Sequence, residues 1–274
     1  KVLSSASILV PYSGKKLNSR STGYWKIRLW DGNDKVSEWS SVSTFSVGLL
    51  DKSDWKAAYI GYPEKNEKSI SPQLKKTFNV LSKGDKTFLY VNSLGYHEVF
   101  LNGEKVGDKV LAPAMVQFNK RSQIITYDIS SLIKEGRNDI VLWIGQGWYS
   151  KGLPGVIDNG PFVRAQVDQL SGGNWNTIVY TDSSWEGRNS GYSTTGSWRA
   201  NEFEGERVDG SLLLPDLSGT TLDKTIWSPV FAADIPEHEV TPQMTESNCI
   251  TDTIKAEIIK PIGKDTWLVD MGTT

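Results

Sequence analysis

The sequence predicts an all-β fold whose main body is a jelly-roll β-sandwich. Short segments in which apolar and polar residues alternate recur along most of the chain, and a period of two is typical of half-buried strands. Long stretches of helical periodicity are nearly absent. Two segments rich in Gly, Ser and Asn, residues 145–161 and 186–210, are expected to be long loops gathered at the ends of the sandwich.

The same patterns divide the chain into three units. In residues 1–50 alternation predicts strands and places Trp25, Ile27 and Leu29 on one strand face. The motif SEWS at residues 37–40, followed by a final apolar strand, resembles the ending of many fibronectin-III-like sandwiches, so residues 1–50 are expected to form part of one. A full sandwich of this type needs about 100 residues, so this unit is expected to be incomplete. Residues 52–232 are expected to form the jelly roll, and residues 233–274 the start of a following β-sandwich domain.

Local signals place the strands and turns of the jelly roll. Asn102–Gly103 predicts a hairpin turn, and Asp128 is expected to cap a short helical turn that ends at Gly136. The expected strands are Gln73–Asn79, Thr87–Ser93, Tyr96–Leu101, Ser122–Asp128, Asp139–Ile144, Phe162–Gln169, Thr177–Thr181 and a last one near Trp227–Phe231.

Composition argues against several classes of function. The net charge is −2 with Lys and Arg spread along the chain, so no basic patch for nucleic acid or anionic membrane is expected. The single cysteine, Cys249, and two distant histidines, His97 and His238, argue against a disulfide framework, a metal cluster of His and Cys, and a Ser/His/Asp triad. His97 is expected to be a hydrogen-bonded or exposed strand residue. No apolar window is long enough to span a membrane.

Aromatic residues are the most informative part of the composition. The chain has 11 tryptophans, which suits either carbohydrate recognition or an aromatic β core. Trp148 and Tyr149 directly follow the strand at 139–144, and two interpretations stay open: the rings close the end of the core, or they are displayed for a ligand. Alternation points Trp185 inward. Most of the tryptophans in the first unit and in the junction that follows it, residues 48–63, are expected in the core: Trp25, Trp30, Trp39 and Trp55.

Several segments together resemble the N-terminal, non-catalytic part of bacterial α-L-rhamnosidases, family 78 of the glycoside hydrolases. They are residues 37–61 (SEWSSVSTFSVGLLDKSDWKAAYIG), 94–113 (LGYHEVFLNGEKVGDKVLAP), 127–152 (YDISSLIKEGRNDIVLWIGQGWYSKG), 181–185 (TDSSW), 205–210 (GERVDG) and 267–274 (WLVDMGTT). In that family a fibronectin-like domain precedes a jelly roll, and an (α/α)6 barrel further along carries the catalytic carboxylates. Ala114–Met115 and Gln146 depart from the family pattern, which leaves the identity of a ligand open.

The resemblance also implies a ligand and a cofactor. The related carbohydrate-binding module of family 67 holds L-rhamnose through a calcium ion, and calcium accepts six to eight oxygen ligands. The platforms available for the sugar are Trp148, Tyr149, Tyr192 and Trp198, and the metal ligands would be Asp158, Asn159, Glu202 and Glu204. The alternatives are that the Asp158–Asn159 pair only turns the chain, and that the acidic segment 202–209 is solvated or forms salt bridges with Arg199 and Arg207.

The sequence therefore predicts a non-catalytic N-terminal region of an α-L-rhamnosidase-like glycoside hydrolase, without catalytic residues of its own. Its expected partner is a carbohydrate, a terminal L-rhamnose or a similar sugar, and it would support a catalytic barrel absent from this chain. The family suggests a secreted, periplasmic or cell-surface protein. The alternative is a structural spacer that docks on the catalytic domain and binds no sugar.

Overall fold

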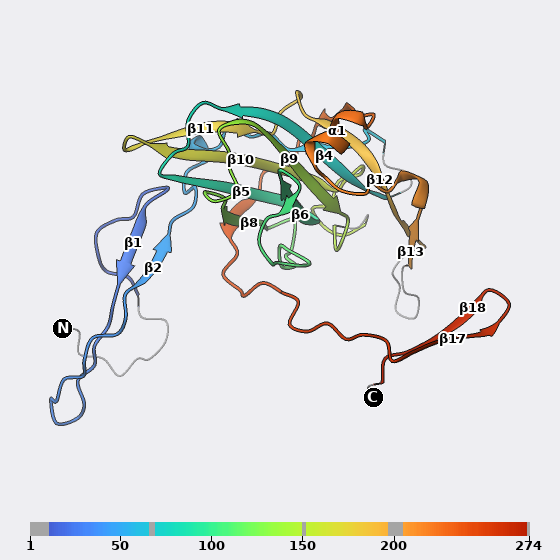
Figure 1. Cartoon of the computed structure of the whole chain (residues 1–274). Helices are drawn as coiled ribbons and strands as arrows, with labels where there is room; N and C mark the ends of the chain where they lie inside the picture. Colours follow the sequence, from blue (N-terminus) through green and yellow to red (C-terminus); the bar gives the residue numbers. More distant parts are fainter. Residues whose placement is uncertain (1–10, 66–68, 150–151, 197–204, 273–274) are drawn as a thin grey trace.

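The computed structural model describes residues 11–65, 69–149, 152–196 and 205–272 (Figure 1). These residues form two large β-sheets and two small ones, with a short helix, α1 (Gly219–Lys224), and two 3-10 turns, η1 (Lys52–Asp54) and η2 (Gly210–Leu212). Within this part of the chain, no helix is long and apolar enough to cross a bilayer. The prediction of an all-β sandwich fold is confirmed.

The first large sheet is called the β5 sheet. Its strands run in the order β15 (Phe231–Ala232), β3 (Ile60–Gly61), β10 (Phe162–Ser171), β5 (Lys86–Leu94), β8 (Arg121–Asp128) and β16 (Glu239–Pro242), and β11 (Asn174–Tyr180) also pairs with β10. Strand β16 runs parallel to β8, whereas the other pairs are antiparallel. The sheet thus continues to residue 242. The predicted domain boundaries stay predictions.

The second large sheet is called the β4 sheet. Its order is β13 (Gly205–Val208), β12 (Glu186–Thr195), β4 (Ile70–Val80), β9 (Gly136–Gly145), β6 (Tyr96–Leu101) and β7 (Glu104–Lys105), and β14 (Ser228–Pro229) pairs with β12. The hairpin turn between β6 and β7 has Asn102 at φ 55° and Gly103 at φ 89°. Positive φ at both central residues is what a type I′ turn requires, so the hairpin prediction is confirmed.

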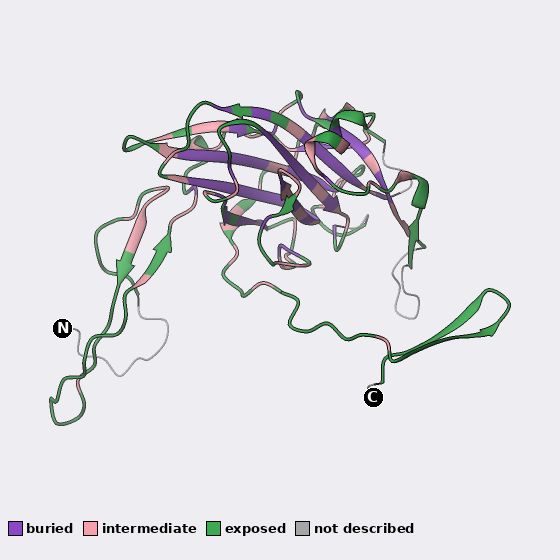
Figure 2. Ribbon diagram, viewed as in Figure 1, coloured by how far each residue is buried: buried purple, intermediate pink, exposed green. Residues whose placement is uncertain are grey.

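The hydrophobic core lies between these two sheets, where most buried residues gather (Figure 2). On β6, His97, Val99 and Leu101 are buried while the alternating residues are only partly covered. Trp185 is 1% exposed, and its indole N–H donates to the Tyr180 carbonyl at 2.8 Å. The inward orientation predicted for Trp185 is confirmed. Alternation also defines an outer face on each sheet.

Residues 186–195 were expected to be loop, and that expectation is wrong, because they form β12 along β4. The strand contains Gly187, Asn189 and Gly191, residues with low strand propensity. A Cβ on Gly187 would lie 2.6 Å from the Tyr62 ring, and the pairing with β4 shifts register between Asn189 and Ser193. Glycine here permits close packing and a bulge. Tertiary pairing therefore overrides local propensity.

The first unit contains a small antiparallel sheet of β1 (Thr22–Trp25) and β2 (Ser43–Ser46). The prediction that its tryptophans lie in a core is wrong for Trp25 and Trp39, which are 48% and 47% exposed. Within the described residues no second sheet layer covers this pair of strands. Instead, the Trp39 ring stacks with the cations of Lys26 and Arg28, at 4.6 and 4.7 Å. Near the other end of the chain, β17 (Ile258–Gly263) and β18 (Thr266–Asp270) form an exposed hairpin.

An ion-pair cluster ties the first unit to the sandwich. Nε of Arg20 donates to Asp168 Oδ2 at 2.6 Å, and one of its terminal nitrogens donates to Asp54 Oδ1 at 2.9 Å. Asp168 lies on β10 and its side chain is 1% exposed. Gln166 adds a hydrogen bond to Asp168 at 3.0 Å. The first unit is thereby fixed to β10, an inner strand of the β5 sheet, by a buried carboxylate.

Candidate functional site

Three aromatic side chains from three strands line a hollow on the outer face of the β4 sheet. They are Tyr96 on β6, Trp143 on β9 and Tyr192 on β12, and the hollow has a volume of about 420 Å³. The ring centroids of Trp143 and Tyr192 lie 5.4 Å apart, with the ring planes at 62°. We call this site the aromatic groove and define it by these three residues together with Glu98 and Glu206, which also line it.

The strand periodicity explains why these side chains meet. On β9, Leu142 and Ile144 are buried in the core, so Trp143 between them points outward. On β6, Glu98 lies directly across from Trp143 in the antiparallel register, and its carboxylate accepts a hydrogen bond from Lys105 at 2.6 Å. Adjacent strands therefore bring an aromatic face and a carboxylate together.

Glu206 completes the groove from the neighbouring edge strand. It lies on β13, where it is exposed and pairs with Thr194. Carboxylates accept hydrogen bonds from hydroxyl groups, and flat aromatic rings offer an apolar surface for the C–H face of a sugar ring. A concave site with apolar walls and a few polar groups is typical of small-ligand recognition.

His97 lies beneath the groove as a buried neutral group. Its Nδ1 is 2.7 Å from Ser93 Oγ and its Nε2 is 3.0 Å from the Tyr127 hydroxyl. Burial lowers the pKa of His97 to about 3, so at neutral pH it adds no positive charge to the groove. The prediction of a hydrogen-bonded strand histidine is confirmed.

The GQGWY segment, residues 145–149, shapes one end of the groove. Gly147 has φ 49°, and a Cβ there would lie 2.7 Å from the Tyr96 ring. Glycine at 147 thus lets the loop pass close against the Tyr96 ring. Burial raises the pKa of Tyr96, and a side-chain hydrogen bond with Trp148 opposes this effect. Trp148 is 39% exposed, so a large part of its ring faces solvent.

Tyr149 has a different environment from Trp148. It is 2% exposed and packs in a small cluster with Leu94 and Phe162. Its ring makes an edge contact with Phe118 at 5.0 Å, and its hydroxyl accepts the Ile157 backbone N–H at 3.1 Å. Of the two open interpretations, Tyr149 closes the end of the core, while the Trp148 ring is partly exposed to solvent. Sugar binding by either residue stays a prediction.

The predicted calcium ligands are only partly described. Asp158 and Asn159 form an exposed turn, with Asn159 at φ 71°, directly before Gly160–Pro161. This geometry is the turn chemistry expected from their sequence. Glu202, Glu204 and the predicted platform Trp198 lie outside the described residues. Among the residues that the structure describes, no group of three or more His, Cys, Asp and Glu could hold a metal ion. The described donors alone therefore do not assemble a calcium site, and the cofactor stays a prediction.

Of the three aromatic residues of the groove, only Tyr192 was predicted from the sequence. Trp143 lies in a continuous apolar run, and only the burial of Leu142 and Ile144 on either side of it places its ring on the opposite face. Tyr96 precedes the buried His97 in the same way. What the sequence could not supply was the sheet order that makes β12, β9 and β6 near neighbours.

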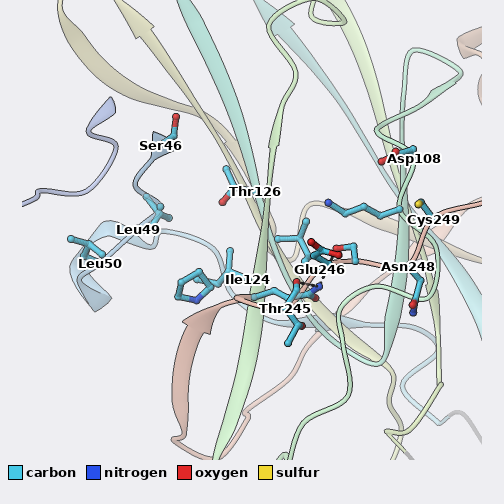
Figure 3. Close-up of a pocket in the computed structure, with 16 residues that line it drawn as sticks. Ser46, Leu49, Leu50, Asp108, Ile124, Thr126, Thr245, Glu246, Asn248 and Cys249 are labelled. Carbon is cyan, nitrogen blue, oxygen red and sulfur yellow. Dashed lines mark hydrogen bonds between the residues drawn. The ribbon is translucent and has the colours of Figure 1, made fainter. Parts of the chain in front are cut away.

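A further hollow lies where residues 46–50 and residues 242–249 cross the β5 sheet (Figure 3). It has a volume of about 500 Å³ and lies between Leu49 and Leu50 of the junction, Ile124 on β8, and the segment 242–249. Lys109 forms a β-bridge with Cys249 beside it. Its lining contains no aromatic ring, so it offers no stacking platform. It is best described as a seam between chain segments.

The described residues thus define a two-sheet β-sandwich domain with an aromatic groove on one sheet face. Residues 82–252 match the family model for the α-L-rhamnosidase N-terminal domain, and residues 1–51 match that for the Rha78A-like N-terminal immunoglobulin domain. The chain therefore belongs to the α-L-rhamnosidase family and contains its N-terminal domain. The assignment of the first unit to the fibronectin-III type stays a prediction.

Individual relatives agree with this family. An α-L-rhamnosidase from Formosa agariphila is 32% identical over 85% of this chain and 26% of its own length. The solved α-L-rhamnosidase from Dictyoglumus thermophilum is 28% identical with a TM-score of 0.82, over 99% of this chain and 31% of its own. The Streptomyces avermitilis α-L-rhamnosidase complexed with L-rhamnose shares the fold at 18% identity, with a TM-score of 0.81 over 99% of this chain and 43% of its own. The chain thus spans less than half the length of each.

Proposed function

We propose that this chain is the non-catalytic N-terminal region of an α-L-rhamnosidase and that its jelly roll recognises a terminal rhamnoside at the aromatic groove. The observation that carries the proposal is the meeting of Trp143, Tyr192 and Glu98 in a hollow of about 420 Å³. Rhamnose is a 6-deoxy sugar with an apolar methyl group and several hydroxyls, so aromatic walls and carboxylates match both sides of its chemistry. A relative of the same fold has been solved with L-rhamnose.

The proposal is tested by titrating the chain with L-rhamnose by calorimetry. We expect weak binding, with a Kd in the micromolar to millimolar range, as is usual for a small polar ligand. Trp143→Ala should weaken binding at least tenfold, and Glu206→Gln, at an exposed position, should weaken it without unfolding the chain. Trp39→Ala is the matched control, because Trp39 is 47% exposed in the first unit. No heat with the unchanged chain would refute recognition at this site.

Calcium binding by this chain and export of the parent protein are two separate parts of the proposal. Asp158 and Asn159 supply two oxygen-bearing side chains on one exposed turn, and calcium needs several more ligands. Repeating the rhamnose titration after treatment with EDTA tests the ion, and equal affinity with and without the chelator contradicts it. Export of the parent protein is tested by finding it in the periplasmic or extracellular fraction.

A structural role without sugar binding is the second candidate. It is favoured by the Arg20–Asp168 ion pair, which fixes the first unit to the sandwich, and by the seam of Figure 3, where residues 242–249 pack against β8. This role predicts no heat with L-rhamnose and no rise in melting temperature at any sugar concentration, since a ligand stabilises a fold only if it binds the folded state.

A further inference from the structure

A third hollow lies on the β5 sheet, beside the hollow of Figure 3 and away from the aromatic groove. It is formed where the junction and residues 235–240 cross the outer face of the β5 sheet, and its volume is about 690 Å³. Trp55, Tyr59, Arg164 and His238 are among the residues that line it. We call it the Arg164 pocket and define it by these four residues. The sugar recognition proposed for the aromatic groove does not involve it.

Arg164 is held by neutral groups. Its guanidinium carbon lies 4.4 Å from the centroid of the Trp55 ring and 4.8 Å from that of Tyr59, and its Nε donates to Asn92 Oδ1 at 3.1 Å. The Tyr59 hydroxyl donates to the same amide oxygen. Among the described residues no carboxylate lies within ion-pair distance of Arg164, whereas Arg20, Arg121 and Arg137 each have one.

This arrangement leaves a positive charge without a counter-charge. A guanidinium has five N–H donors, and the contacts with Asn92 and Tyr59 use only part of them. Burial lowers the pKa of Arg164, which means that its charge is partly desolvated. Arg188 also has no carboxylate partner in the described part of the chain, but its terminal nitrogens donate to Gln73 and to the Leu212 carbonyl. Arg164 therefore differs in having donors available at a pocket wall.

The other charges of the lining lie at the exposed rim. Lys52 and Glu237 form an ion pair with side chains 84% and 80% exposed, and Glu239 is 62% exposed, 3.8 Å from Arg121. Asp51, also at the rim, is exposed. Solvent screens such charges strongly, so the rim carboxylates oppose an anionic ligand only weakly. The half-buried charge that a ligand would meet inside the pocket is Arg164.

We propose that the Arg164 pocket binds a saccharide that carries an oxyanion, either a uronate carboxylate or a sulfate ester. The planar guanidinium matches two oxygens of such a group with two parallel hydrogen bonds. The pocket volume is within the range of small-ligand sites. The oxyanion follows from Arg164, whereas the choice of a saccharide rests on the carbohydrate recognition proposed above. The two sites lie on different sheets, so they can be tested separately.

The test is calorimetric titration of the full chain with glucuronate, glucose 6-sulfate and glucose. We expect at least one charged sugar to bind tenfold or more tightly than glucose, with an affinity that falls as NaCl is added. Arg164→Gln should remove this preference, and Arg164→Lys, which keeps the charge but not the planar fork, should reduce it. Arg137→Gln is the matched control, because Arg137 is exposed and its partners lie outside the pocket.

The outcomes separate this proposal from the function proposed for the groove. Trp143→Ala should abolish L-rhamnose binding and leave the binding of the charged sugar unchanged. Equal affinity of the unchanged chain for glucose and for both charged sugars overturns the Arg164 proposal even if Arg164→Gln fails to fold. Acetate or inorganic sulfate binding as tightly as the charged sugars overturns the assignment to a saccharide.

Discussion

Replacement of Arg20 by Ala tests whether the first unit is fixed to the sandwich by a buried ion pair. Arg20 contacts Asp168 at 2.6 Å and Asp54 at 2.9 Å, and its own side chain is 16% exposed. Asp168 is 1% exposed. Without Arg20 the Asp168 carboxylate stays buried and keeps the hydrogen bond from Gln166 at 3.0 Å, but it loses its counter-charge.

The expected loss in the free energy of unfolding follows from the burial of Asp168. Breaking a buried ion pair by removing one side costs about 3–5 kcal/mol, because an uncompensated charge is left inside. We expect the lower part of this range, about 3 kcal/mol, since Gln166 still satisfies part of the carboxylate and Arg20 is not fully buried. The double variant Arg20→Ala with Asp168→Asn should recover part of the loss, because it removes the unpaired charge together with the pair.

The assay is urea unfolding followed by tryptophan fluorescence. Lys52→Ala is the matched control, because the Lys52–Glu237 pair is almost fully exposed and its loss should leave the free energy of unfolding nearly unchanged. The difference in the free energy of unfolding between the two variants should persist in high salt. If Arg20→Ala lowers the free energy of unfolding no more than Lys52→Ala does, the stabilising role of the buried Arg20–Asp168 ion pair is refuted.

Two further predictions concern the surroundings of the groove. Burial lowers the pKa of His97 from 6.5 to about 3. Between these pH values the unfolded chain binds a proton at His97 that the folded chain does not. The free energy of unfolding should therefore fall by up to about 1.4 kcal/mol for each unit by which the pH is lowered. His97→Gln should flatten this dependence in acid titrations followed by circular dichroism, and an unchanged slope would count against it. Gly147→Ala should cost more stability than Gly196→Ala, because both have positive φ but only the Cβ at 147 meets the Tyr96 ring, at 2.7 Å. Equal melting temperatures of the two glycine variants would show that this contact is unimportant.

The strands that were predicted correctly are those whose side chains alternate clearly. On β6 the alternation of His97, Val99 and Leu101 with outward residues is visible in the sequence and recurs in the structure. Strand β12 was missed because its Gly, Asn and Ser residues lack strand propensity, and its place is determined by β4 and by the close approach of Tyr62. Long-range pairing of this kind is not encoded in a local pattern.

The candidate site, too, could be predicted from the sequence only in part. Sequence reasoning selected loop aromatics and assigned Trp148 and Tyr149 together, but one ring is 39% exposed and the other 2%. Whether a loop ring points inward depends on its tertiary neighbours, here Phe118 and Phe162 for Tyr149. Trp143 was overlooked because a tryptophan inside an apolar run is indistinguishable from a core residue until both sheet faces are known.

The most direct test of the account is a crystal structure of this chain grown with L-rhamnose. We predict that the sugar lies in the aromatic groove, with its C–H face against Trp143 or Tyr192 and its hydroxyls within hydrogen-bonding distance of Glu98 or Glu206. A sugar bound only at the turn of Asp158 and Asn159, or no sugar at a concentration that saturates the calorimetric titration, would contradict recognition at the groove.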